Sequence, residues 1–84
     1  MGAVGVTQFD KQIGRNVYNI LVERNMLQTD LSRLLDESPV RTNRHINGKT
    51  GFTAKDIYMI AKVLNVSVDV LLDNCDHYIT EKET

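Results

Sequence analysis

Four basic side chains lie close together near the middle of this 84-residue chain. The stretch from Ser38 to Lys55 holds Arg41, Arg44, Lys49 and Lys55 and contains no acidic residue. Guanidinium and ammonium groups clustered in this way attract polyanions such as the phosphate backbone of a nucleic acid. The whole chain nevertheless has a net charge of −1, because an acidic end offsets this centre. Nucleic-acid binding therefore stays open beside the plainer interpretation, a solvated helix face.

The other chemistry-bearing side chains do not form a catalytic or metal site. Cys75 and His77 make a Cys-x-His pair, but two ligands cannot close a four-coordinate zinc site. No neighbouring group orients this histidine as a base for the thiol. His45 is expected to pack, hydrogen-bonded, on the inner face of a helix. We therefore expect no enzyme activity, no metal and no cofactor.

Five amphipathic helices are predicted to position the basic side chains. Apolar residues recur at helical spacing over about residues 8–24, 28–35, 39–46, 54–64 and 68–72. The start signals are two capping boxes and a Ser-Pro pair, at Thr7–Asp10, Thr53–Asp56 and Ser38–Pro39. Asn47-Gly48 is expected to end the third helix, and Ser67 to cap the fifth.

Length and composition are those of one globular domain. Apolar residues make up 42% of the chain and charged residues 25%, and the single cysteine excludes an internal disulfide. No apolar run approaches the roughly 20 residues needed to span a bilayer, and the N-terminus has no signal-peptide core. We expect a cytoplasmic protein with no membrane association. Residues 1–74 would form the domain, with an arm at about 1–7 and a polar, acidic tail at 75–84.

Three short motifs occur at the spacing of a known family. They are Gln28-Thr29-Asp30-Leu31-Ser32, Asn47-Gly48-Lys49 and the segment IAKVLNVSV at 60–68. From Ile13 to Leu72 the chain resembles the phage repressor and Cro-like helix-turn-helix family, also called the xenobiotic-response-element type. The resemblance implies an all-α fold, a compact five-helix lambda-repressor-like DNA-binding domain with the helix-turn-helix at about 28–46. It also implies that the third helix enters the DNA major groove.

Four features depart from the family pattern. Leu27 stands where the second helix usually has a capping Ser or Thr, and Ser32 replaces an alanine. Thr42 takes a buried aliphatic position, so its hydroxyl needs a hydrogen-bond partner. Leu21 and Ile46 stand where many relatives pair an arginine with a glutamate. Replacing both members of a buried ion pair by apolar residues is often neutral or stabilising, so we expect these two side chains to touch.

The outward residues of the third helix are predicted to read bases: Pro39, Val40, Arg41, Asn43 and Arg44. Arg44 is the strongest specificity candidate, because a guanidinium can donate two hydrogen bonds to guanine O6 and N7. Val40, together with Pro39, is expected to contact a thymine methyl group. Arg41 and Asn43 are expected to bind a base or a phosphate.

Contacts to the DNA backbone are expected from the start of the second helix and from the loop after the third. The residues are Gln28, Thr29, Asn47, Lys49 and Thr50. Gln28 is the leading anchor, because the N-terminus of a helix itself favours anions. The three loop residues lie where the family's loop meets the backbone, although Asn47 can also serve the turn alone.

Two functions fit these features. The first is a sequence-specific regulator of transcription, a small repressor of the phage or prophage type. It would bind a double-stranded DNA operator as a homodimer, with half-sites about one helical turn apart. The second is a protein-interaction module or antitoxin on the same fold, for which the acidic tail and a protein partner or anti-repressor would matter more. The two functions are distinguished by whether Arg41, Arg44 and Lys49 form one exposed patch beside Gln28.

Overall fold

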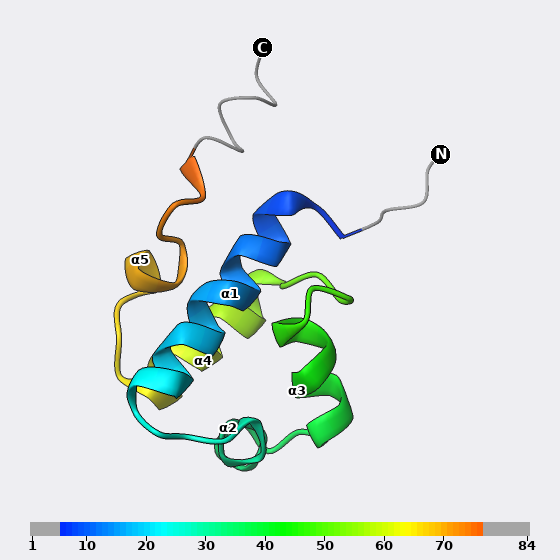
Figure 1. The fold of residues 1–84 in the computed structure, drawn as a ribbon, viewed down its shortest axis with the longest axis vertical. Coiled ribbons are helices and arrows are strands. Elements are labelled where there is room, and N and C mark those ends of the chain that lie inside the picture. Colours follow the sequence, from blue (N-terminus) through cyan, green and yellow to red (C-terminus); the bar gives the residue numbers. More distant parts are fainter. Residues whose placement is uncertain (1–5, 77–84) are drawn as a thin grey trace.

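Residues 6–76, the part of the chain that the computed structural model describes, fold into five helices without a strand (Figure 1). In chain order the helices are α1 (Gln8–Glu23), α2 (Gln28–Leu35), α3 (Pro39–Ile46), α4 (Ala54–Leu64) and α5 (Val68–Leu71). The predicted all-α fold is confirmed, and the predicted bounds agree to within one residue. Residues 1–5 of the predicted arm and 77–84 of the predicted tail lie outside the described residues. No described helix is both long and apolar enough to cross a membrane.

Side-chain hydrogen bonds begin three of the helices. Both predicted capping boxes are present, one at α1 (Thr7 with Asp10) and one at α4 (Thr53 with Asp56). Ser38 caps α3 as predicted, since its hydroxyl accepts the backbone N–H of Arg41 at 3.1 Å. The prediction that Ser67 caps α5 is wrong, because Ser67 stands at the N-cap position but its side chain makes no capping hydrogen bond.

Apolar side chains from all five helices meet in one core. Its fully buried members include Ile13, Val17, Leu21, Leu31, Leu64 and Leu71. Burying an aliphatic side chain of this size contributes about 1.5–3 kcal/mol. Leu21 and Ile46 both belong to the core, and their direct contact stays a prediction. Cys75, assigned to the tail from sequence, is only 1% exposed, so the packed part of the chain reaches at least to this residue.

A buried amide joins the C-terminal part of the domain to α1. The Asn16 side chain donates to the backbone carbonyls of Leu71 and Asp73, each at 2.8 Å. Its own carbonyl oxygen accepts from the Gln12 side chain at 3.0 Å. Buried polar groups are stabilising only when they are hydrogen-bonded, and Asn16 is fully satisfied here. Asn16 therefore fixes α5 on one side of α1, opposite α3 (Figure 1).

A glycine on α1 lets α3 approach closely on the other side. A Cβ atom built on Gly14 would lie 2.7 Å from the carbonyl oxygen of Ile46 and 2.9 Å from that of His45. Both atoms belong to the backbone at the end of α3, so they cannot rotate away. The distance between α1 and α3 therefore requires glycine at this position.

Gly14→Ala tests this close approach. We expect the substitution to lower the free energy of unfolding by about 1–3 kcal/mol, because overpacking outweighs the usual gain of alanine over glycine in a helix. Urea denaturation measures the change. The control is Asn19→Ala at an exposed position of the same helix, expected to change stability by less than about 0.7 kcal/mol. If Gly14→Ala were as stable as the control, the two helices would lie further apart than described.

Candidate nucleic-acid interface

Helix α3 has a buried face and an exposed face, as its sequence predicts. Thr42, His45 and Ile46 are buried against the rest of the domain. Val40 is 63% exposed, and Arg44 is exposed one turn later. Pro39 occupies the first, exposed turn of the helix. The exposed face of α3 therefore offers one apolar side chain and one guanidinium side by side, since residues four apart are neighbours on a helix.

Three amide side chains form a hydrogen-bonded row beside this face. Asn43 on α3 donates to the Gln28 side chain on α2 at 2.9 Å, and it accepts from the Asn47 side chain at 3.1 Å. Asn43 and Asn47 are exposed, and Gln28 is half-buried. Because Gln28 accepts through Oε1, its two Nε2 hydrogens are left for another acceptor. The row fixes the orientation of all three amides before any ligand arrives.

The start of α2 presents backbone N–H groups without a side-chain cap. Leu27 stands at the N-cap and has no side-chain hydrogen bond. The Asp30 carboxylate instead accepts the backbone N–H of Leu27 at 2.8 Å. Within residues 6–76 the first two amides of the helix, those of Gln28 and Thr29, have no hydrogen-bond acceptor. Such a helix end, with its positive dipole, favours an anion.

The loop after α3 presents an exposed lysine. Gly48 has φ +76°, the left-handed conformation that ends a helix, and lies against the aliphatic part of Lys11. The backbone N–H of Lys49 donates to the Arg44 carbonyl at 2.8 Å. Lys49 is exposed and Thr50 is half-buried. Asp10 holds the far end of the loop, because it accepts the backbone N–H of Phe52 at 3.1 Å.

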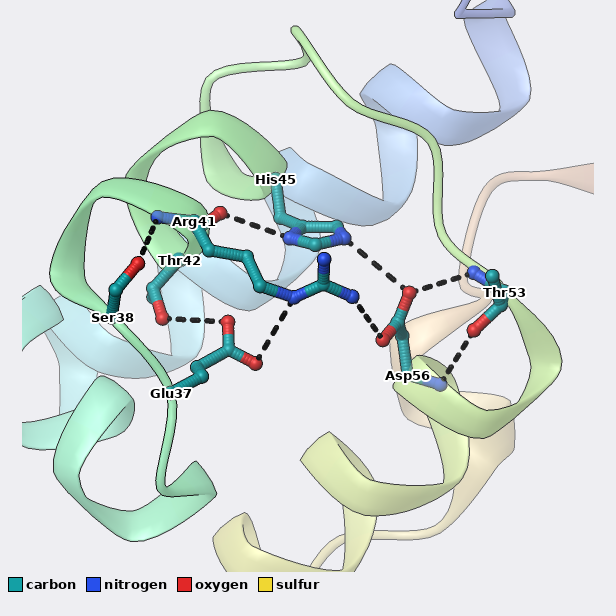
Figure 2. Close-up of polar contacts among 7 residues, drawn as sticks. All are labelled: Glu37, Ser38, Arg41, Thr42, His45, Thr53 and Asp56. Atoms are coloured by element: carbon teal, nitrogen blue, oxygen red, sulfur yellow. Dashed lines mark hydrogen bonds and ion pairs between the residues drawn. The ribbon is translucent and has the colours of Figure 1, made fainter.

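Arg41 differs from the other predicted base-reading residues. Its guanidinium points toward α4 and lies between two carboxylates (Figure 2). Nε is 3.7 Å from Glu37 Oε2, and Nη2 is 3.3 Å from Asp56 Oδ1. The side chain is still 52% exposed. Arg41 is therefore ion-paired toward α4, whereas Arg44 and Lys49 are exposed. That Arg44 and Lys49 form one patch beside Gln28 stays a prediction.

His45 sits on the buried face of α3, hydrogen-bonded and packed as predicted. Nδ1 is 3.0 Å from the Arg41 carbonyl oxygen, and the ring lies 4.9 Å from that of Phe52. A carbonyl only accepts hydrogen bonds, so Nδ1 carries a proton. Nε2 lies 3.3 Å from Asp56 Oδ2. Nε2 is buried and has no hydrogen-bond partner among the described residues, so this contact is a close approach to the carboxylate rather than a hydrogen bond.

Asp56 is the residue of this region whose role the sequence did not reveal. From the sequence it is only the third helical residue of a capping box. In the structure its two oxygens also face Arg41 and His45 on α3 (Figure 2). The sequence held one signal for this role. The basic stretch from Ser38 to Lys55 contains no acidic residue, so an ion-pair partner for Arg41 had to come from outside it. Only the fold brings Asp56 there.

The environment of Asp56 lowers the pKa of its carboxyl group below the ordinary 3.8. Desolvation by burial, the largest single effect, raises the pKa. Together the hydrogen bonds from the backbone and hydroxyl of Thr53 and the charges of His45 and Arg41 outweigh it and stabilise the ionised form. The carboxylate is therefore ionised at neutral pH and available to both partners.

Two further polar groups of the region are accounted for. The Thr42 hydroxyl, which needed a partner, donates to Glu37 Oε1 at 2.9 Å. Cys75 lies away from this surface, and burial together with the charges of Asp76 and Asp73 raises the pKa of its thiol. A protonated, buried thiol is a poor nucleophile. Its predicted neighbour His77 lies outside the described residues.

Comparison with known proteins identifies relatives of the chain. The helix-turn-helix family profile matches residues 17–71, well over half of the chain. The wild-type restriction-modification controller protein C.Esp1396I has a similar structure, with a TM-score of 0.73 and 20% sequence identity. That match covers 89% of this chain and 97% of the controller protein.

Two other solved structures share the fold at lower identity. The restriction-modification controller protein C.AhdI from Aeromonas hydrophila is 14% identical with a TM-score of 0.72, over 77% of this chain and 98% of that one. The clp gene regulator ClgR from C. glutamicum is 13% identical with a TM-score of 0.75, over 84% and 92%. The comparison with curated proteins finds no match.

Asp56→Asn tests the contribution of this carboxylate through its pH dependence. A group whose pKa is lowered in the folded state contributes stability that is complete above its unfolded pKa, about 3.9, and lost as the pH falls through the folded pKa. We therefore expect wild type to be more stable than Asp56→Asn at about pH 5, with a difference that shrinks below about pH 4. Urea denaturation from neutral to acidic pH measures this difference.

The control for this experiment is Asp69→Asn, which neutralises an exposed aspartate away from α3. We expect it to change stability by less than about 0.5 kcal/mol at any pH tested. A stability difference for Asp56→Asn that stayed constant down to strongly acidic pH would contradict the described environment of the carboxylate.

Proposed function

Because the chain belongs to the helix-turn-helix family, it is a DNA-binding transcriptional regulator, and we propose that it is a small repressor that binds its operator as a homodimer. The observation that carries this proposal is the exposed face of α3, where Val40 and Arg44 lie beside the amide row and the open N-terminus of α2. Basic and amide side chains on one exposed face match the chemistry of base edges and phosphates.

In this proposal the exposed face of α3 lies in the major groove. Arg44 donates two hydrogen bonds to a guanine, and Val40 with Pro39 contacts a thymine methyl group. Asn43 faces the same groove, with its amide held by Gln28 and Asn47. An asparagine amide can pair with the N6 and N7 atoms of adenine. Side chains that are ordered before binding lose less conformational entropy when they bind.

The proposed backbone contacts surround this face. The amides of Gln28 and Thr29 and the Gln28 side chain would bind a phosphate at the start of α2. Lys49, with Asn47 and Thr50, would bind the phosphates on the other side of the groove. These contacts carry no base information, but they set the register of α3 in the groove. They also supply the part of the binding that depends on salt concentration.

The similarity to regulators supports the same function. Two of the similar structures are restriction-modification controller proteins and one is a clp gene regulator. A symmetric dimer of such a domain presents two copies of α3, and it reads an inverted repeat whose half-sites lie about 10 base pairs apart or a multiple of that. A dimer bound across a promoter would exclude polymerase, which is the basis of the proposed repression.

An in-vitro selection from random duplex DNA tests this function. We expect the wild type to enrich an inverted repeat. Arg44→Ala should relax the preference at one position of each half-site and weaken binding by about 1–3 kcal/mol, because it removes a bidentate contact to a base. Arg15→Ala, at an exposed position of α1, removes the same charge outside α3 and should leave both properties close to wild type. If the wild type enriched no sequence at low salt, a protein partner would be the better candidate.

Lys49→Ala tests the phosphate contacts separately. We expect binding to weaken by a similar factor for the selected duplex and for unrelated DNA, because a phosphate contact is independent of sequence. The slope of log K against log salt should fall in magnitude by about 0.9. Lys62→Ala, which removes a lysine lying 5.7 Å from the Tyr58 ring on α4, is the control. An unchanged salt slope for Lys49→Ala would remove this residue from the interface.

A further inference from the structure

Helix α3 is supported unevenly by the rest of the domain. It packs directly against α1 and α2, whereas its packing against α4 is sparse. A cleft of about 500 Å3 lies between α3 and α4. An eight-residue helix is not stable in isolation, so its orientation depends on the groups that hold it. On the α4 side those groups have to bridge the cleft.

The carboxylate of Asp56 makes this bridge. Oδ1 is hydrogen-bonded to the Arg41 guanidinium at 3.3 Å, and Oδ2 lies 3.3 Å from the buried His45 Nε2, so the carboxylate faces two successive turns of α3 and is bonded to the first of them (Figure 2). Asp56 is itself held in place, because the Thr53 backbone N–H donates to Oδ2 at 2.9 Å and the Thr53 hydroxyl caps α4. Asp56 therefore joins a capped helix to the helix that faces DNA.

The partners of Asp56 belong to one network of charges. Arg41 also forms an ion pair with Glu37, and Glu37 accepts a hydrogen bond from the Thr42 hydroxyl. Arg41 thus lies between one carboxylate at the turn before α3 and another on α4. The Arg41–Asp56 contact is a charge-assisted hydrogen bond, which is stronger than a neutral one, and the 3.7 Å contact with Glu37 is an ion pair. Their arrangement resists rotation of α3 about its own axis and tilting of α3 into the cleft.

We infer that Asp56 is a positioning residue for DNA binding, which holds α3 in its reading orientation through its ion pair with Arg41. The inference rests on the proposed function, and it assigns Arg41 to the support of α3 rather than to base contact. Asp56 touches no DNA in this arrangement. Its removal acts on binding only through the orientation of α3.

The direction of the effect separates this role from simple electrostatics. Removing a negative charge from a DNA-binding protein strengthens binding if only long-range charge matters. Loss of Asp56 would also release Arg41, and a released guanidinium near DNA would strengthen binding further. A positioning role predicts the opposite change in affinity: removing Asp56 weakens DNA binding, because a misoriented α3 loses its base contacts.

The experiment compares Asp56→Ala with Thr53→Ala at a temperature where circular dichroism shows both to be fully folded. Both substitutions remove a member of the same capping box, but Thr53→Ala keeps the Asp56 carboxylate and the backbone N–H that holds it. Two properties are measured: the affinity for the duplex enriched by the wild type, and the backbone N–H residual dipolar couplings of α3 relative to α1 in the free protein. Because every variant is folded, loss of stability alone changes neither.

We expect Asp56→Ala to bind the selected duplex about tenfold more weakly and to show altered couplings in α3. Thr53→Ala should stay within about twofold of wild type in affinity, with unchanged couplings in α3. Arg41→Ala lacks a capping role and serves if Asp56→Ala does not fold. It should alter the couplings in the same way. Where Asp56→Ala folds, the double variant should bind no more weakly than Asp56→Ala, because both residues act through one contact.

The inference is overturned if Asp56→Ala binds the duplex as tightly as wild type or more tightly, or if its α3 couplings are unchanged. Additive losses from Asp56→Ala and Arg41→Ala would also overturn it, because they would show that Arg41 contacts DNA directly. Failure of the wild type itself to enrich any duplex would instead refute the proposed function. The two failures are therefore distinguishable within one set of measurements.

Discussion

The buried face of α3 is largely polar, and the rest of the site depends on how that face is satisfied. Two of its three buried residues, Thr42 and His45, carry groups that cost free energy when buried without a hydrogen bond. Glu37 satisfies the first, and the Arg41 carbonyl binds Nδ1 of the second, whose Nε2 lies 3.3 Å from Asp56 without a hydrogen bond. Because these partners come from the turn before α3 and from α4, the same contacts that allow burial also set where the opposite face points.

Two arginines on one short helix have different surroundings for this reason. Arg41 and Arg44 are both exposed, but they lie at different angles around α3. Arg41 lies one turn from Glu37 and faces Asp56, so its charge is matched inside the domain. Arg44 lies on the outward face, where no described carboxylate is within ion-pair distance. The charge that remains for a polyanion is set by such local pairing rather than by the net charge of the chain.

Departures from the family pattern also acquire a physical meaning. Leu27 cannot cap α2, and the Asp30 carboxylate is hydrogen-bonded to the N–H of Leu27 itself. The amides of Gln28 and Thr29 are thereby left for an external anion, as the proposed DNA contact requires. Thr42 in place of an aliphatic residue is accommodated because Glu37 lies within hydrogen-bond reach. Each departure is matched by a neighbour in the fold.

The sequence by itself determined the five helices, the caps of α1, α3 and α4, the inward and outward faces of α3 and the family resemblance. These features depend on spacing and on contacts within about four residues, which a sequence displays directly. The tertiary structure alone decided that Arg41 pairs with Asp56, 15 positions away, and that Asn16 holds the backbone of Asp73, 57 positions away. It also decided that Cys75 belongs to the core. Such partners meet only once the helices have packed, because helical periodicity shows which way a side chain faces but not what it will face.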